Sequence, residues 1–92
     1  MLSQIPIDLT GVGKEDLDRE ILRVGMIAEL DAVNLYEQMA AITTSSRIKA
    51  TLLDIAREEK THVGEFQALL LELDKEQVTE RAAGKKEVAE LD

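Results

Sequence analysis

The chain is organised around the stretch DIAREEKTH, residues 54–62, which lies inside a pattern typical of a helix. Glu59 and His62 are three positions apart, so on a helix their side chains share one face. The other members of that face recur at helical spacing and are apolar: Leu52, Ile55, Ala56, Val63, Phe66, Leu69 and Leu70. The pattern therefore predicts that a carboxylate and the only histidine of the chain point toward a core.

Burying a charged group is costly unless another group compensates it. A metal ion would do so, and Glu-x-x-His projecting inward is half of the ligand set of di-iron carboxylate bundles. The alternative is a core histidine that the neighbouring glutamate satisfies. Such a pair arises easily by chance in a chain with 33% charged residues. On this motif alone, both interpretations stay open.

The composition limits the fold and the partners. The 92 residues allow one small domain, and the core must be aliphatic because Phe66 and Tyr36 are the only aromatic residues. A domain of this size buries only about 60% of the surface that its unfolded chain exposes, so we expect an oligomer. The absence of cysteine excludes a disulfide framework and a thiolate zinc site.

The charge and the apolar runs exclude further classes. A net charge of −8 argues against binding to nucleic acid, which requires a basic surface, and suits a protein that attracts small cations. Apolar runs fall far short of the roughly 20 residues of a membrane span. The first residues lack the basic region of a secretory signal, so we expect a cytoplasmic location.

The chain begins with an expected N-terminal arm, residues 1–13, in which a proline and two glycines interrupt any periodicity. The first helix is expected to begin near Lys14. Its first turns are acidic, as the helix dipole favours: Glu15, Asp16, Asp18 and Glu20. Its apolar residues spread around more than one face, which requires more than one neighbour. In a two-helix chain, the additional neighbour must be another copy.

The segment 43–46, Thr-Thr-Ser-Ser, is expected to end the first helix and to cap the second, residues 47–73. So short a connection makes the two helices antiparallel neighbours. A short third helix, capped near Asp74, is expected to end near Gly84, and residues 85–92 form an expected tail or linker. The predicted fold is all-α: a hairpin domain over residues 14–84 that dimerises into a ferritin-like four-helix bundle.

Glu29 on the first helix is a candidate partner for the Glu-x-x-His pair. It lies roughly 15 residues before the turn and Glu59 roughly 14 after it, which places both at similar height at about 1.5 Å per residue. Gly25 and Ala32 flank Glu29 on its face and suggest room beside its carboxylate. Alternatively, Glu29 points to solvent.

Asp31 and Glu37 are expected on the polar side of the same helix. Tyr36 shares the face of Glu29 two turns away. It is either a support for the metal ligands or a core aromatic residue whose hydroxyl reaches the surface.

One chain thus offers half of a di-iron site, which predicts a symmetric dimer with the metal pair on its two-fold axis. Each metal would bind Glu59 and His62 of one chain, while Glu29 of both chains bridges the pair. Carboxylate and imidazole ligands without thiolate suit iron or manganese rather than structural zinc. Repulsion between carboxylates at the axis implies that assembly depends at least partly on metal.

The segments AELDAVNLYEQ, residues 28–38, and REEKTH, residues 57–62, together resemble the encapsulated ferritins. These are truncated ferritin-like proteins housed in encapsulin nanocompartments, and the likeness covers about residues 14–80. It implies a ring-shaped decamer built from dimers, oxidation of Fe(II) to Fe(III), and storage of the iron inside the encapsulin shell. By position, the ferroxidase ligands would be Glu29, Glu59 and His62, with Tyr36 beside the di-iron centre.

Two features depart from that family. Its members admit metal at an acidic site that includes two glutamates of the first helix, and Ala28 and Asp31 stand in their places here. The resemblance therefore implies at most a weak secondary cation site at Asp31. The C-terminal end carries no clear shell-targeting peptide, and the sequence is similar to the domain that some archaeal encapsulins carry ahead of the shell protein.

Two other functions compete with a ferroxidase. A helical module that dimerises or packages cargo without catalysis would use Glu59 and His62 as a buried polar pair that fixes register. A rubrerythrin-like peroxidase normally holds a complete site in one chain together with a cysteine-ligated iron. The missing cysteines and the half-length bundle argue against the peroxidase.

Overall fold

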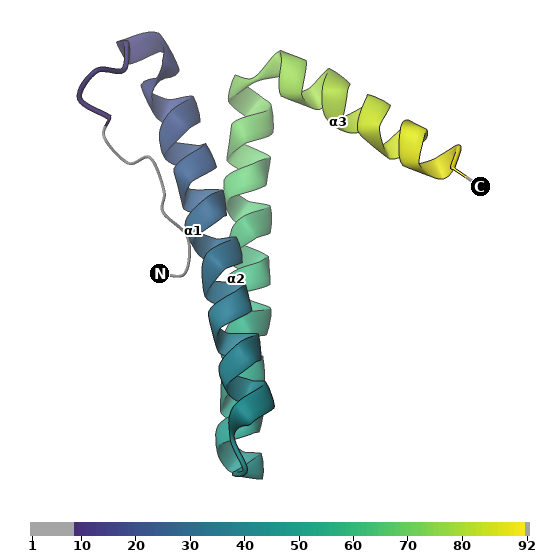
Figure 1. The fold of residues 1–92 in the computed structure, drawn as a ribbon. Coiled ribbons are helices and arrows are strands. Elements are labelled where there is room, and N and C mark those ends of the chain that lie inside the picture. The colour runs from purple at the N-terminus through teal and green to yellow at the C-terminus, as the bar shows by residue number, and fades with distance from the viewer. Residues whose placement is uncertain (1–8, 92) are drawn as a thin grey trace.

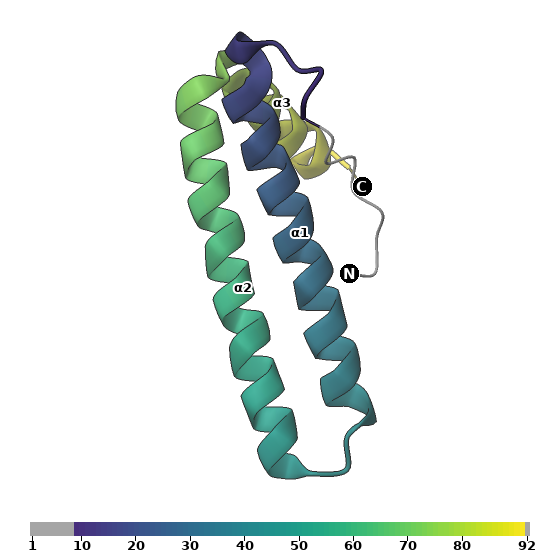
Figure 2. The same ribbon diagram turned by 90° about the vertical axis from the view of Figure 1, so that its left-hand side faces the viewer.

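A computed structural model describes residues 9–91 of the chain. The described chain contains α1 (Lys14–Ile42), α2 (Ser46–Leu73) and α3 (Lys75–Ala89). Helices α1 and α2 lie antiparallel along their whole length, and α3 leaves the open end of this hairpin at a wide angle (Figures 1 and 2). This arrangement confirms the predicted all-α hairpin with a third helix, and the dimer remains a prediction. None of the helices formed by residues 9–91 is long and apolar enough to cross a membrane.

The turn between α1 and α2 is stabilised by its own hydroxyl groups. The side chain of Ser45 accepts a hydrogen bond of 3.2 Å from the backbone N–H of Ile48, which caps α2. The Thr43 hydroxyl oxygen accepts another from the backbone N–H of Ser45. The predicted cap of the second helix is therefore present, and the connection is three residues long. So short a turn keeps the end of α1 close to the beginning of α2.

Asp74 separates α2 from α3 and ties their junction to α1. Its carboxylate accepts a hydrogen bond of 3.0 Å from the backbone N–H of Gln77, which caps α3. Its other oxygen lies 2.9 Å from a guanidinium nitrogen of Arg23 on α1. The Asp74 side chain thus caps α3 and links the junction between α2 and α3 to α1.

The third helix is longer than the sequence predicted, because it passes through Gly84 and ends at Ala89. One glycine inside a helix costs only about 1 kcal/mol. Two alanines precede Gly84 and two lysines follow it, and both residue types are strong helix formers. The positive charge of Lys86 in the last turn also suits the helix dipole. Of the predicted N-terminal arm, residues 1–8 lie outside the described residues, and residues 9–13 form a turn that leads into α1.

The core is a narrow seam between α1 and α2. Its buried apolar residues are Leu22, Val33, Ala40, Ala56 and Leu70. At Gly25 the two helices approach closely, because a Cβ atom added there would lie 2.9 Å from ring atoms of Phe66. The space at Gly25 therefore holds an aromatic ring, and the prediction that it leaves room beside Glu29 was wrong.

Alanine at Gly25 should act differently from alanine at Gly64. Both are helical, and alanine gains about 1 kcal/mol of helix propensity over glycine. At Gly64, where nothing lies within 4 Å of an added Cβ, the gain should appear in full. At Gly25, displacement of Phe66 should cancel the gain and destabilise the hairpin by about 1–3 kcal/mol. Urea unfolding of the two variants measures this, and equal stabilisation of both would contradict the close packing.

Asp74 should make the free energy of unfolding depend on pH in the acidic range. The backbone N–H of Gln77 and then the Arg23 guanidinium hold the pKa of Asp74 below its ordinary value of 3.8. A carboxyl group whose pKa is lowered by folding stabilises the fold at any pH above its ordinary pKa. This stabilisation is lost as the pH falls through the pKa that the group has in the folded chain.

The variant Asp74→Asn keeps an oxygen that can cap α3 but has no charge. It should be less stable than the unmodified chain at neutral pH, and the difference should shrink below about pH 4. Urea unfolding from pH 7 to pH 3 measures the difference. A gap that stays constant throughout would show that the charge of Asp74 does not contribute.

Candidate metal centre

Two glutamates occupy positions of the apolar seam. Glu29 lies between the buried residues Leu22 and Val33 on α1, seven and four positions away, and so shares their face. Glu59 is three positions from the buried Ala56 on α2 and so shares its face. Both carboxylate side chains are 20% exposed. The antiparallel hairpin therefore brings two carboxylates together where apolar side chains would stabilise the fold better.

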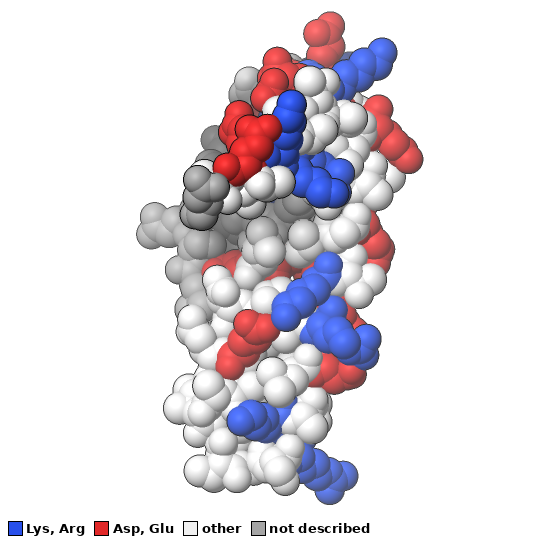
Figure 3. All heavy atoms as spheres, turned by 90° about the vertical axis from the view of Figure 1, so that its right-hand side faces the viewer, with Lys and Arg blue, Asp and Glu red and all other residues white. Residues whose placement is uncertain are grey.

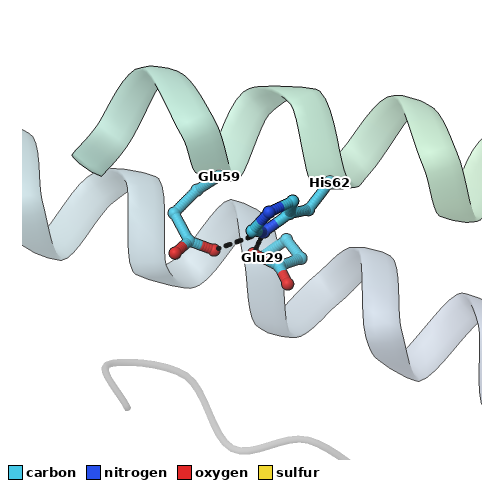
Figure 4. Close-up of side chains that lie close together, drawn as sticks. All are labelled: Glu29, Glu59 and His62. Carbon is cyan, nitrogen blue, oxygen red and sulfur yellow. Dashed lines mark ion pairs between the residues drawn. The ribbon is translucent and has the colours of Figure 1, made fainter. Parts of the chain in front are cut away.

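His62 lies between the two carboxylates. Its Nδ1 atom is 3.4 Å from Oε2 of Glu29 and 3.4 Å from Oε2 of Glu59 (Figure 4). One donor atom from each residue falls within a set whose members are all within 4.8 Å of one another. The structure thus brings together the three residues that the sequence singled out, and Glu29 faces α2 rather than solvent. The predicted match of heights places them level.

One buried polar atom of this cluster has no hydrogen-bond partner among the described residues. Oε2 of Glu29 is buried and accepts no hydrogen bond, since its contact with His62 meets the distance of an ion pair but not the geometry of a hydrogen bond. A single imidazole N–H cannot satisfy two carboxylates at once. Leaving a buried acceptor unpaired costs about 1–3 kcal/mol. The arrangement therefore favours a cation among the three side chains.

The nearest lysine does not supply that cation. Lys60 follows Glu59 directly in sequence, but its ammonium group lies 2.9 Å from Oε2 of Glu37 on α1. Among residues 9–91, only His62 forms an ion pair with Glu29 or Glu59. Sequence spacing did not indicate the Lys60–Glu37 contact, because the two residues lie at different heights and only the long lysine side chain joins them.

The donor atoms limit which ion would fit. Two carboxylate oxygens and one imidazole nitrogen suit Fe²⁺ or Mn²⁺, and no thiolate is available to favour structural zinc. Three donors from one chain do not complete an octahedral set. The His62 side chain is 44% exposed, so one flank of the cluster is open to further ligands.

The other two candidates lie apart from the cluster. Tyr36 is half-buried two turns along α1, and within the described chain no hydrogen bond joins its hydroxyl to the three ligand candidates. Asp31 is only 6% exposed, although we expected it on the polar side of the first helix. A step of two residues turns Asp31 to the far side of α1 from Glu29.

Metal should stabilise the folded chain through Glu29. A divalent ion at a hundred times its dissociation constant adds about 2.7 kcal/mol to the free energy of unfolding. Thermal unfolding with and without Mn²⁺ should show this as an increase in Tm. The variant Glu29→Gln should lose the increase, whereas the matched variant Glu37→Gln, on the same helix but 45% exposed, should keep it. An unchanged increase in Glu29→Gln would exclude this carboxylate as a ligand.

The sequence is similar to one protein family and to two characterised proteins. The family model described as Rubrerythrin matches residues 20–92. A ferritin-like–encapsulin shell fusion protein of Pyrococcus furiosus is 63% identical over 78 residues, which are 85% of this chain and 22% of that protein. The encapsulin nanocompartment cargo protein EncC of Myxococcus xanthus is 39% identical over 69 residues, 75% of this chain and 50% of that protein.

A solved structure is similar over nearly the whole chain. The crystal structure of the encapsulated ferritin domain from Pyrococcus furiosus matches with a TM-score of 0.84 and 54% sequence identity. The match covers 99% of this chain and 95% of that one. The chain thus spans nearly the length of that solved domain, but half or less of the length of the two relatives above.

Proposed function

Since this chain belongs to the Rubrerythrin family and, within it, to the encapsulated ferritin-like domains, we propose that it is a ferroxidase whose di-iron site forms between two copies. The observation that carries the proposal is the cluster of Glu29, Glu59 and His62, in which a buried carboxylate oxygen of Glu29 has no hydrogen-bond partner. Iron is both the substrate and the ion that would compensate this buried charge.

A second copy would complete the site. A two-fold axis beside the open flank of His62 would bring together two sets of three donors, six in all. Each iron would bind Glu59 and His62 of one chain, and Glu29 of both chains would bridge the two irons. This set matches the glutamates and Glu-x-x-His pairs of ferritin-like bundles.

The reaction would remove one electron from each of two Fe²⁺ ions. The two electrons and two protons would reduce one dioxygen to hydrogen peroxide, or one hydrogen peroxide to two waters. The four carboxylates of two copies favour the more highly charged Fe³⁺ over Fe²⁺ because the attraction grows with ionic charge. The two imidazoles would act as nitrogen donors.

Two further residues have subordinate roles in the proposal. Tyr36 shares the face of Glu29 and would support the site from two turns away. Asp31, which faces away from Glu29 on α1, would hold at most a second and weaker cation.

The two similar proteins suggest where in the cell this activity would take place. One carries its ferritin-like part in the same chain as an encapsulin shell, and another is an encapsulin cargo protein. We propose by analogy that this domain works inside an encapsulin nanocompartment in the cytoplasm, as a ring-shaped decamer built from dimers. It would pass Fe³⁺ to a store inside the shell. An acidic chain with a net charge of −8 suits the attraction of Fe²⁺.

Iron oxidation by matched variants tests the activity. One Fe²⁺ per chain should be oxidised faster than in protein-free buffer, and Glu59→Gln or His62→Ala should reduce the rate to that of buffer. Glu58→Gln is the matched control, because Glu58 is exposed beside Glu59 and outside the cluster. Stopped-flow absorbance with dioxygen and, separately, with hydrogen peroxide gives the rates and the preferred oxidant.

Two outcomes would contradict the proposal. Normal oxidation by His62→Ala would show that the ligand assignment is wrong. Absence of any acceleration by the unmodified chain, while its oligomer is intact, would leave the cluster as the buried polar pair of a non-catalytic assembly module.

A further inference from the structure

The close approach of the two helices at Gly25 lies next to the candidate metal centre. Gly25 is one helical turn before Glu29 on α1, and Phe66 is one turn after His62 on α2. Residues four apart on a helix are neighbours on its surface. A Cβ atom at Gly25 would lie 2.9–3.0 Å from three ring atoms of Phe66. The ring therefore reaches from α2 to the backbone of α1, on the side of the cluster that faces the open end of the hairpin.

The direction of the side chains brings this ring toward the ligand candidates. In a helix, side chains lean toward the N-terminus and cover the preceding turn. The Glu29 carboxylate therefore leans toward Gly25, and the Phe66 ring leans toward His62. Because α1 and α2 are antiparallel, these two side chains lean toward each other along the hairpin (Figure 2). The ring and the carboxylate thus converge at the same height.

One oxygen of Glu29 is kept away from water at this place. Many carboxylates of this chain project from its surface, as the red side chains in Figure 3 show. Oε2 of Glu29 differs, because it is buried and accepts no hydrogen bond from the described residues. Water satisfies most buried polar atoms that lack a protein partner, unless apolar groups exclude it. An aromatic ring on the side toward which the glutamate leans is such a group.

We infer that Phe66 is a positioning residue of the metal centre: its ring excludes water from Oε2 of Glu29 and leaves a metal ion as the group that can satisfy this atom. Apolar groups around a metal site control the access of solvent to its ligands. Gly25 takes part because a Cβ atom at its position would displace the ring. The inference rests on the proposed function, since it concerns the ligands of the same site.

Removal of the ring should weaken metal binding. In Phe66→Leu, water can reach Oε2 of Glu29 and donate a hydrogen bond to it before any metal binds. A metal ion then gains less, because it has to displace this water. Satisfying one buried acceptor changes an equilibrium constant roughly tenfold. We therefore expect Phe66→Leu to bind Mn²⁺ roughly tenfold more weakly than the unmodified chain, as measured by electron spin resonance of the free ion.

Leu22→Ala is the matched control for a loss of stability. Leu22 is buried on α1, seven residues before Glu29, and its side chain leans away from the cluster. Its truncation should destabilise the fold at least as much as Phe66→Leu does, but should keep the affinity for Mn²⁺. The variants are compared at protein concentrations at which sedimentation shows the same oligomer as for the unmodified chain.

Water relaxation separates the exclusion of water from a general loss of packing. Bound Mn²⁺ relaxes the protons of water molecules that exchange near the ion, so the relaxation rate per bound ion measures how much water reaches it. At saturating Mn²⁺, this rate should rise in Phe66→Leu and stay unchanged in Leu22→Ala. An unchanged affinity or an unchanged relaxation rate in Phe66→Leu would overturn the inference.

Alanine at Gly25 tests the role of the glycine. In the unmodified chain, Gly25→Ala should weaken Mn²⁺ binding, because the added methyl group displaces the Phe66 ring. In the Phe66→Leu variant, the same methyl group should strengthen binding, because it fills part of the space that the ring has left and excludes water again. Gly64→Ala should change binding in neither chain, since nothing lies within 4 Å of a Cβ atom there. Equal weakening by Gly25→Ala in both chains would contradict a role of the glycine through the ring.

The outcomes also separate this inference from the proposed function. Binding of Mn²⁺ requires no oxidation, so weaker binding and faster water relaxation in Phe66→Leu would support the inference even if iron is oxidised no faster than in buffer. Equally tight binding by Phe66→Leu and the unmodified chain would overturn the inference and leave the proposed ferroxidase intact. Absence of Mn²⁺ binding by the unmodified chain would overturn both.

Discussion

The structure depends on two carboxylates that face each other across an otherwise apolar seam. Glu29 and Glu59 occupy core positions, and one imidazole lies 3.4 Å from both. Two such charges in a small core oppose folding of the isolated hairpin, because a buried carboxylate requires a compensating charge or several donors. The protein thus places this pair near the middle of its two longest helices, where a metal site can be held rigidly.

Other contacts hold the two helices around this pair. The approach of Phe66 to Gly25 fixes the spacing on one side of the cluster, and the Lys60–Glu37 pair bridges the helices on the other. Asp74 and Arg23 then fix the open end. Each exposed ion pair contributes only about 0–1 kcal/mol.

The sequence predicted the parts that follow from helical periodicity. A short Thr/Ser turn between two long periodic segments leads to an antiparallel hairpin, and counting residues from the turn places Glu29 level with Glu59. The sequence did not predict what depends on neighbours. The ring of Phe66 fills the space at Gly25, Asp31 is buried, and α3 passes through Gly84. Such features depend on which side chains meet in three dimensions and on sums of small propensities, and spacing along one helix contains neither.

Native mass spectrometry of the protein titrated with Fe²⁺ without oxygen tests the central claim most directly, because it counts chains and irons in the same ion. An intersubunit site predicts that iron appears in dimers or multiples of dimers, with two irons per dimer, while monomers stay free of iron. Monomers that bind iron as tightly as dimers, or dimers that form without taking up any iron, would contradict a site built from Glu29, Glu59 and His62 of two chains.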